Sequence, residues 1–388
     1  MKTKILIYCA TVYVAFFFSA CGGSSNSPLA DIDLIPMGNA YYTLDGELAF
    51  AGEFRDADFF SDGLAKVLME MCEGYAFINK KGEKVFDVGE CFNITGFWNG
   101  VAWKMTQEGY IAIDTSGKEL FTTLATPITL FNADGKALVE GGTEDGKTRY
   151  GVIDRKGNIS LFQGDFCIYG EKNSRVIHSD RIVVNCNPGG QPAVIDMQGN
   201  IIVEPETYSE IGPFDLNGCA IVRKDGMYGI IDRDGKELFM DTEGKYSWIT
   251  CDGDWYAYCL KGRDGGFAWG DKKGNVKLGP LEDNLSFRWG KYAFYGSKRY
   301  DRSGDSESTA TAKQIETPLI GGKVVVAYSN DEGYFLCDEK GNRLNYDVSV
   351  EGLMNSGVDD LIRSVSRGNG DAIALGFPYV STFWSLGE

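Results

Sequence analysis

The sequence is poor in the side chains that most often build reactive sites. It contains one histidine, His178, in 388 residues. Zinc sites and Ser-His-Asp or Cys-His catalytic arrangements usually require imidazole, so this scarcity argues against both. Neither a Gly-x-Ser-x-Gly motif nor a phosphate-binding glycine loop is present. We therefore expect no metal, no cofactor and no catalysis.

Positive charge and long apolar runs are also scarce. Lys and Arg number 38 against 55 Asp and Glu, which gives a net charge of −17. A chain this acidic repels nucleic acid and anionic lipid headgroups, so we expect no nucleic-acid partner. After residue 18, no segment approaches the roughly 18 apolar residues of a membrane-spanning helix. Only ten prolines accompany fifty glycines, a balance that indicates many tight turns rather than disorder.

The N-terminus has the form of an export signal. Lys2 and Lys4 precede an apolar run over residues 5–18, and Ser19-Ala20-Cys21 follows. This stretch is similar to the bacterial lipoprotein signal. The resemblance implies removal of residues 1–20 and a lipid on Cys21, which makes the membrane a partner. The alternative is an ordinary secretory signal cut near Ala20. Residues 21–38 then form a flexible tether, and Gly22 favours the outer membrane of the cell envelope.

Eight cysteines remain after the signal peptide and the lipidated residue. An even number in an exported chain permits disulfides, although eight allow 105 pairings. Cys251 with Cys259 and Cys167 with Cys186 are the candidate bridges. Cys337 lies in an apolar strand pattern, which indicates a buried thiol.

One phrase recurs along the chain: alternating apolar residues, then Asp or Asn, two further residues, and Gly. Its Asx positions are 30 to 42 residues apart, with a mean near 37. Such even spacing is typical of repeat architectures. The clear copies place the turn residues at Asn79 and Gly82, Asp114 and Gly117, Asp154 and Gly157, Asp196 and Gly199, Asp232 and Gly235, Asp271 and Gly274, and Asp338 and Gly341.

The phrase predicts an antiparallel β-hairpin. The Asx side chain can accept hydrogen bonds from backbone amides just downstream, and Gly supplies the left-handed conformation that ends the turn. Alternation such as Ile111 and Ile113 against Tyr110 and Ala112 predicts one inward-facing set of side chains. A second element, such as Phe97-Trp-Asn-Gly100, precedes several hairpins and reads as a turn into another strand. We therefore expect about three strands per unit.

The combined pattern resembles the bacterial WG (KWG) repeat over residues 39–346. Tyr150-Gly151 and Tyr228-Gly229 stand where that family has its Trp-Gly pair. The resemblance implies an envelope repeat protein without an assigned chemistry.

The sequence predicts an all-β fold of hairpin units of about 37 residues arranged as a β-propeller-like ring, with an open β-solenoid as the alternative. Eight units are recognisable, and an eroded ninth surrounds Asp45-Gly46. A hairpin around Asp134-Gly135 falls between units and suggests an insertion. Residues 347–388 depart from the pattern and predict a capping helix and strand.

The aromatic residues between 246 and 300 are the best candidates for a binding face, because rigid rings are frequent anchors in recognition. The alternative is that they form the strand core. The candidates are Trp248, Trp255, Tyr256, Tyr258, Trp269 and Trp289.

The leading functional hypothesis is a lipid-anchored, non-catalytic scaffold that binds a protein or a glycan. A rival is a glycan-processing enzyme with acidic residues in the ring, since glycosidases need two carboxylates. Close pairs are Asp56/Asp58, Asp252/Asp254 and Asp359/Asp360. A purely structural envelope component is the third possibility.

Overall fold

The computed structural model describes residues 32–344, except residues 70–73, 145–146, 169–179, 187–189, 216, 263–264, 288, 310–311, 316–318 and 330–332. The predicted signal peptide, the predicted tether up to residue 31 and the predicted C-terminal cap lie outside the described residues. So do Cys72, His178 and the pair Asp359/Asp360.

Within the described ranges, 33 strands form nine antiparallel sheets, and there is no helix. The first three sheets are β1 (Leu34–Met37), β2 (Ala40–Thr43) and β3 (Leu48–Ala51); β4 (Phe54–Ala57), β5 (Leu64–Met69), β6 (Tyr75–Asn79) and β7 (Lys84–Asp87); and β8 (Asn93–Ile94), β9 (Val101–Thr106), β10 (Gly109–Asp114) and β11 (Glu119–Thr123). The next three are β12 (Thr126–Pro127), β13 (Lys136–Glu144), β14 (Lys147–Asp154) and β15 (Ile159–Leu161); β16 (Phe166–Cys167), β17 (Arg181–Cys186), β18 (Pro192–Asp196) and β19 (Ile201–Val203); and β20 (Glu210–Ile211), β21 (Cys219–Lys224), β22 (Met227–Asp232) and β23 (Glu237–Met240). The last three are β24 (Tyr246–Asp252), β25 (Trp255–Leu260), β26 (Phe267–Gly270) and β27 (Val276–Leu281); β28 (Tyr292–Tyr295), β29 (Lys298–Asp301) and β30 (Ser306–Ser308); and β31 (Gln314–Ile315), β32 (Val324–Ser329) and β33 (Gly333–Asp338).

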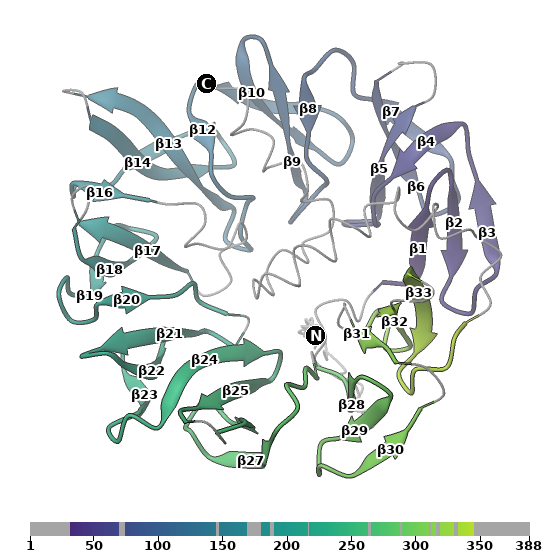
Figure 1. Cartoon of the computed structure of the whole chain (residues 1–388). Helices are drawn as coiled ribbons and strands as arrows, with labels where there is room; N and C mark the ends of the chain where they lie inside the picture. The colour runs from purple at the N-terminus through teal and green to yellow at the C-terminus, as the bar shows by residue number, and fades with distance from the viewer. Residues whose placement is uncertain are drawn as a thin grey trace, which may run out of the picture.

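The nine sheets follow one another around a common centre (Figure 1). The ninth sheet lies beside the first, so the chain forms a ring rather than an open solenoid. Lys323 Nζ, which precedes β32, lies 3.1 Å from Asp45 Oδ1 in the β2–β3 turn. The propeller-like prediction is confirmed, because residues 278 positions apart meet where the ring closes.

The hydrophobic core is divided among the sheet interfaces. Each buried cluster in the described residues joins two successive sheets. Ile113 packs toward the second sheet, whereas its neighbour Ala112 packs toward the fourth. The predicted single inward-facing set is therefore wrong. Successive side chains point to opposite faces of a strand, and both faces are covered by a neighbouring sheet.

The recurring Asx-x-x-Gly phrases form the turns between the last two strands of the sheets, except Asp338–Gly341, which follows the last strand, β33. The turn glycines at 82, 117, 157, 199, 235, 274 and 341 have φ between +77° and +87°. Each donates its amide to the Asx carbonyl oxygen at 2.9–3.0 Å. In one representative turn, Asp114 Oδ1 accepts the amides of Ser116 and Lys118 at 2.9 and 3.1 Å. This left-handed backbone favours glycine because other L-residues meet steric conflict there.

Most sheets have more strands than the three that the sequence predicts. Six sheets have four strands, because a strand as short as β8, β12, β16 or β20 precedes the longer ones. The Asn132–Gly135 turn connects β12 to β13 and is part of the fourth sheet, so the predicted insertion is wrong. The first strand begins at Leu34, inside the segment expected to be tether.

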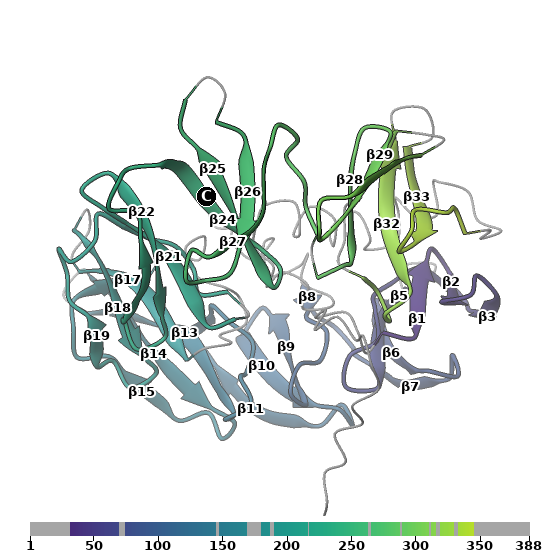
Figure 2. The ribbon, with the colours of Figure 1, turned by 90° about the horizontal axis from the view of Figure 1, so that it is seen from below.

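The ring has two different faces, because antiparallel strands reverse direction at each connection. The Asx-x-x-Gly turns lie at one end of each sheet, and we call this end the turn face. The hairpins between the two central strands, such as Thr106–Gly109 and Lys224–Met227, lie at the opposite end, the hairpin face. Figure 2 shows the ring from its side, with strands such as β32 and β33 running between the two faces.

Candidate functional site

The six aromatic residues singled out in the sequence lie on β24, β25 and β26 and in the loop before β28. Four side chains are at most 8% exposed: Tyr256, Tyr258, Trp269 and Trp289. Tyr256, Tyr258 and Trp269 pack the seventh sheet against its neighbours. Trp248 and Trp255 are only partly buried, so they are the two candidates that present ring surface to a partner.

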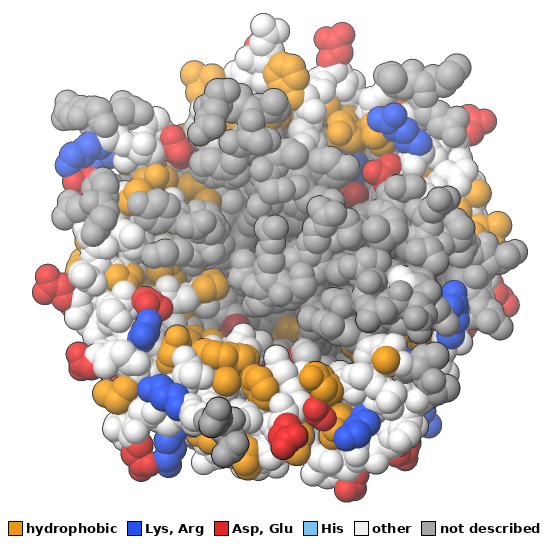
Figure 3. Space-filling model, viewed as in Figure 1, with side chains coloured by type: hydrophobic (Ala, Val, Ile, Leu, Met, Phe, Trp, Pro, Cys, Tyr) orange, Lys and Arg blue, Asp and Glu red, His pale blue; other side chains and the backbone are white. Residues whose placement is uncertain are grey.

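Trp248 lies at the hairpin end of β24, opposite Cys259 of β25. Its ring centroid is 6.0 Å from that of Phe267. Hydrophobic side chains gather at the ring's rim over β24 and β25, in the lower left of Figure 3, with Lys and Arg side chains nearby. Apolar side chains of the seventh sheet thus remain accessible at this rim.

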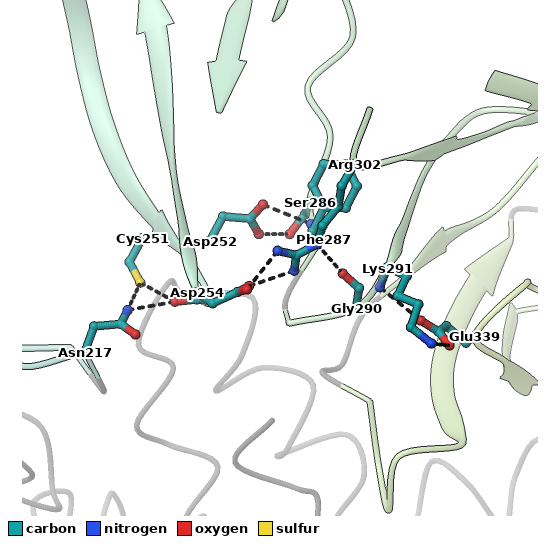
Figure 4. A network of polar contacts seen from close by, with 11 residues as sticks. Asn217, Cys251, Asp252, Asp254, Ser286, Phe287, Gly290, Lys291, Arg302 and Glu339 are labelled. Carbon is teal, nitrogen blue, oxygen red and sulfur yellow. Dashed lines mark hydrogen bonds and ion pairs between the residues drawn. The ribbon is translucent and has the colours of Figure 1, made fainter. Parts of the chain in front are cut away.

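Trp255 lies on the turn face beneath Arg302. The guanidinium carbon is 4.7 Å from the Trp255 ring centroid. Two guanidinium nitrogens donate to the Asp254 carboxylate at 2.7 and 2.8 Å, and Nε donates to the Gly290 carbonyl at 2.8 Å (Figure 4). A forked, stacked arginine contact of this kind holds its partners in one geometry, so Arg302 clamps the eighth sheet to the seventh.

Asp252 and Asp254 are two positions apart in the sequence, but their carboxylates bind different groups. Asp252 is buried and accepts the Ser286 hydroxyl at 2.7 Å and the Phe287 amide at 2.9 Å. Asp254 pairs with Arg302 instead. Figure 4 shows both carboxylates turned toward groups of the following repeat. Their oxygens are thus engaged in holding successive sheets together.

The same network extends to further sheets. Asn217, before β21, donates to the Gly253 carbonyl at 2.8 Å. On the other side, the Lys291 amide donates to Glu339 at 3.0 Å (Figure 4). These contacts connect the sixth to ninth sheets along the turn face. Sequence spacing could not reveal them, because each joins residues 34 to 48 positions apart.

A second polar cluster is buried between the second and third sheets. Lys66 on β5 forms an ion pair with Asp58 at 2.9 Å, and the two side chains are only 3% and 8% exposed. The Lys66 ammonium also donates to the Ile94 carbonyl at 3.4 Å. The Tyr41 hydroxyl donates to the Asp58 carbonyl at 2.6 Å. The burial of Lys66 could not be predicted from the sequence, because a lysine is usually exposed. The apolar residues on both sides of it are the only indication that it is buried.

Asp56 lies on the same face of the second sheet as Asp58, because residues two positions apart in an extended chain point the same way. Burial, followed by the nearby Asp58 charge, raises the pKa of Asp56 to about 6. Burial likewise raises the pKa of the Tyr75 hydroxyl and of the Cys91 thiol. The cluster combines an ion-paired carboxylate with a second carboxylate that takes up a proton readily, a combination capable of acid–base chemistry.

The candidate disulfides are wrong in the structure, where Cys167, Cys186, Cys251 and Cys259 are thiols. Cys186 pairs with Phe166, the residue before Cys167, so the two cysteines point to opposite faces of their sheet. Cys259 pairs with Trp248, three residues from Cys251. Cys337 is buried, as the sequence predicts.

The described residues contain no converging set of three His, Cys, Asp or Glu side chains suited to a metal ion. In this same part of the chain, no helix has the length and apolar character needed to cross a bilayer.

Comparison with protein families identifies the repeat. The family described as WG containing repeat matches residues 194–228. These residues begin on β18, pass through the Asp196–Gly199 turn and end on β22. The chain therefore contains a segment that matches the WG repeat. The matched unit starts in one sheet and ends in the next, so this repeat contributes strands to two neighbouring sheets.

One solved structure resembles this chain in fold, and two others align more weakly. A crystal structure entitled "eukaryotic initiation factor" aligns with a TM-score of 0.52 at 11% identity, covering 80% of this chain and 94% of that one. AztD from Citrobacter koseri aligns with a TM-score of 0.35 at 13% identity, covering 83% and 94%. The uncharacterised protein lmo1340 from Listeria monocytogenes reaches 0.34 at 11% identity, covering 71% and 94%. No curated protein matches the sequence.

Proposed function

We propose that this protein is a lipid-anchored scaffold of the cell envelope that binds a protein or glycan partner without catalysis. The anchor is supported by the basic, apolar and small-residue pattern that ends at Cys21. Two or more acyl chains on that residue would hold the protein firmly, since each buried CH₂ contributes about 0.8 kcal/mol.

Mass spectrometry of the N-terminal peptide tests the anchor. We expect a peptide that begins at a lipid-modified Cys21 and a protein that fractionates with membranes. In a cell with two membranes, the Gly22 pattern favours the outer one. Cys21→Ala should remain unlipidated and lose membrane association. An unmodified peptide cut near Ala20 would instead show an ordinary secretory signal.

The binding role is supported most directly by the accessible hydrophobic rim over β24 and β25, where Trp248 is partly exposed. Exposed aromatic surface beside polar residues is typical of recognition sites. Affinity capture from envelope extracts and glycan arrays, each with residues 29–388, test this role. Trp248→Ala should weaken capture, whereas Leu124→Ala, which truncates an 85% exposed side chain of the third sheet, should not. Equal effects of both variants would contradict the assignment of this rim.

A glycan-processing enzyme is the second candidate, and the Asp56, Asp58 and Lys66 cluster favours it. Glycoside hydrolysis uses a carboxyl group with a raised pKa together with a second carboxylate, and Asp56, whose pKa is raised to about 6, lies near the Asp58 charge. Release of reducing ends from envelope polysaccharides, abolished by Asp56→Asn, would establish this alternative. Unchanged polysaccharide, with intact binding, supports the scaffold.

A further inference from the structure

We infer that the turn face of the ring lies against the lipid bilayer, and that the hairpin face points away from it. This inference rests on the proposed lipid anchor at Cys21. It adds the orientation of the scaffold, which the anchor alone does not specify.

The first support is the direction in which the chain enters the ring. Leu34 pairs with Thr43 at the turn end of the first sheet, and Met37 and Ala40 form the hairpin end. Asp33, one residue earlier, forms an ion pair at 2.7 Å with Lys80 in the Asn79–Gly82 turn. The described chain therefore starts on the turn face.

The segment between Cys21 and the ring is short. Residues 22–31 can span at most about 35 Å when fully extended, since each residue contributes up to about 3.5 Å. Ile32 is 8% exposed, and a Cβ on Gly321 of the ninth sheet would lie 2.3 Å from its carbonyl oxygen. The segment thus starts from a fixed point on the turn side of the ring, where the first and ninth sheets meet.

The second support is charge. The seven turns named above, the Asp301–Gly304 turn and the equivalent Thr43–Gly46 turn hold nine basic and three acidic side chains at their two central positions, in a chain with a net charge of −17. The basic residues are Lys80, Lys81, Arg155, Lys156, Arg233, Lys272, Lys273, Arg302 and Lys340, and the acidic ones are Asp45, Asp234 and Glu339. Seven aspartates open these turns, so nine basic and ten acidic side chains give the turns a net charge of −1, and the acidic excess of the chain lies outside them.

Several of these cations are available to a surface. Lys80 and Arg302 are held in ion pairs. Lys81, Lys156, Lys272, Lys273 and Lys340 are exposed, and no ion pair within the described residues engages them. The turn aspartates sit behind the tips, where their oxygens accept backbone amides, as in the Asp154 turn.

Screening allows the tips to outweigh the net charge. At physiological ionic strength the Debye length is about 8 Å, so an anionic headgroup responds mainly to the nearest charges. Exposed basic side chains at the central turn positions, such as Lys81 and Lys156, are therefore the charges nearest to the headgroups. Anionic phospholipid is therefore the surface that fits the turn face.

Lysine acetylation of the full, lipidated protein tests the orientation. The protein is reconstituted into vesicles of phosphatidylcholine with phosphatidylglycerol, isolated by flotation and treated briefly with an amine-acetylating reagent. We expect several-fold slower modification of Lys81, Lys156, Lys272 and Lys273 than in detergent. Lys224, Lys261 and Lys298 on the hairpin face are exposed matched controls and should react equally in both.

The outcomes separate the orientation from the anchor. Flotation with equal labelling of the two faces, or with protection of the hairpin face, overturns the orientation and leaves the anchor intact. Failure of the chain to float overturns the anchor, and the orientation with it. Substituting Lys81→Glu, Lys156→Glu, Lys272→Glu and Lys273→Glu should preserve flotation and reduce the protection of Lys340. Unchanged protection of Lys340 in that variant contradicts the role of the basic tips.

Discussion

The ring of Phe86 packs on Gly117 across the boundary between the second and third sheets. A Cβ built on Gly117 would lie 2.8 Å from Phe86 Cδ2, closer than van der Waals contact permits. The same relation recurs between Phe50 and Gly82 and between Phe121 and Gly157. Each turn glycine thus serves two purposes: it permits the left-handed backbone, and it makes room for a large side chain of the preceding sheet.

Replacing this glycine should cost more than the backbone conformation alone. Gly117→Ala combines a left-handed alanine, about 1–2 kcal/mol, with overpacking of about 1–3 kcal/mol. Gly100 is a matched control, because its φ is +79° and a Cβ at this position would have no neighbour within 4 Å. Thermal melting should show a clearly larger loss of stability for Gly117→Ala than for Gly100→Ala. Equal losses would mean that Phe86 does not press on the glycine.

The turn aspartate should be replaceable by asparagine but not by alanine. Asn79 makes the same pair of amide contacts with its Oδ1 as Asp114 does. Asp114→Asn should therefore change the melting temperature little at neutral pH, whereas Asp114→Ala leaves two amides without an acceptor and should lose about 1–2 kcal/mol. A large loss in Asp114→Asn would show that the negative charge, and not the acceptor, stabilises the turn.

Breaking the buried ion pair should strongly destabilise the ring. Lys66→Met leaves the Asp58 carboxylate without its cation, which typically costs about 3–5 kcal/mol for a buried pair. The double variant Asp58→Asn with Lys66→Met removes both charges and should recover much of that loss. Unfolding measured by circular dichroism distinguishes the two. A double variant less stable than Lys66→Met would contradict this account of the pair.

Asp56 should make stability depend on pH in a defined direction. Its pKa is about 6 in the folded chain, above the ordinary value of 3.8. Between these values the folded chain holds a proton that the unfolded chain has lost, so the contribution of Asp56 to stability falls as pH rises and is lowest above pH 6. Asp56→Asn should stabilise the protein at pH 7.5 and have little effect near pH 4. The difference in melting temperature across this range checks the sign, and a benefit confined to pH 4 would contradict it.

The sequence revealed local features better than distant ones. The Asx-x-x-Gly turns could be predicted, because their hydrogen bonds join residues two to four positions apart. The two-residue strand β8 could not, since Asn93 and Ile94 carry too little pattern. The packing of Phe86 on Gly117 could not be predicted either, although a large apolar residue four positions after the turn glycine recurs at Phe50, Phe121 and Phe239.

The candidate site was harder to predict because its contacts cross between repeats. Trp269 and Tyr258 looked like binding anchors, but they are buried because both faces of their sheet are covered. The Arg302–Asp254 clamp joins positions 48 residues apart and depends on the angle between two sheets. Composition and periodicity do not fix that angle.

A zero-length carbodiimide cross-link between Lys323 and Asp45 is the most direct test of the closed ring. The two side chains are exposed and 3.1 Å apart, so the native protein should yield their cross-linked peptide. Lys80 and Asp33, an exposed pair at 2.7 Å between adjacent sheets, provide the positive control. In an open stack, sheets spaced about 10 Å apart would separate the first and ninth by about 80 Å. Detection of the Lys80–Asp33 link without the Lys323–Asp45 link would contradict the ring.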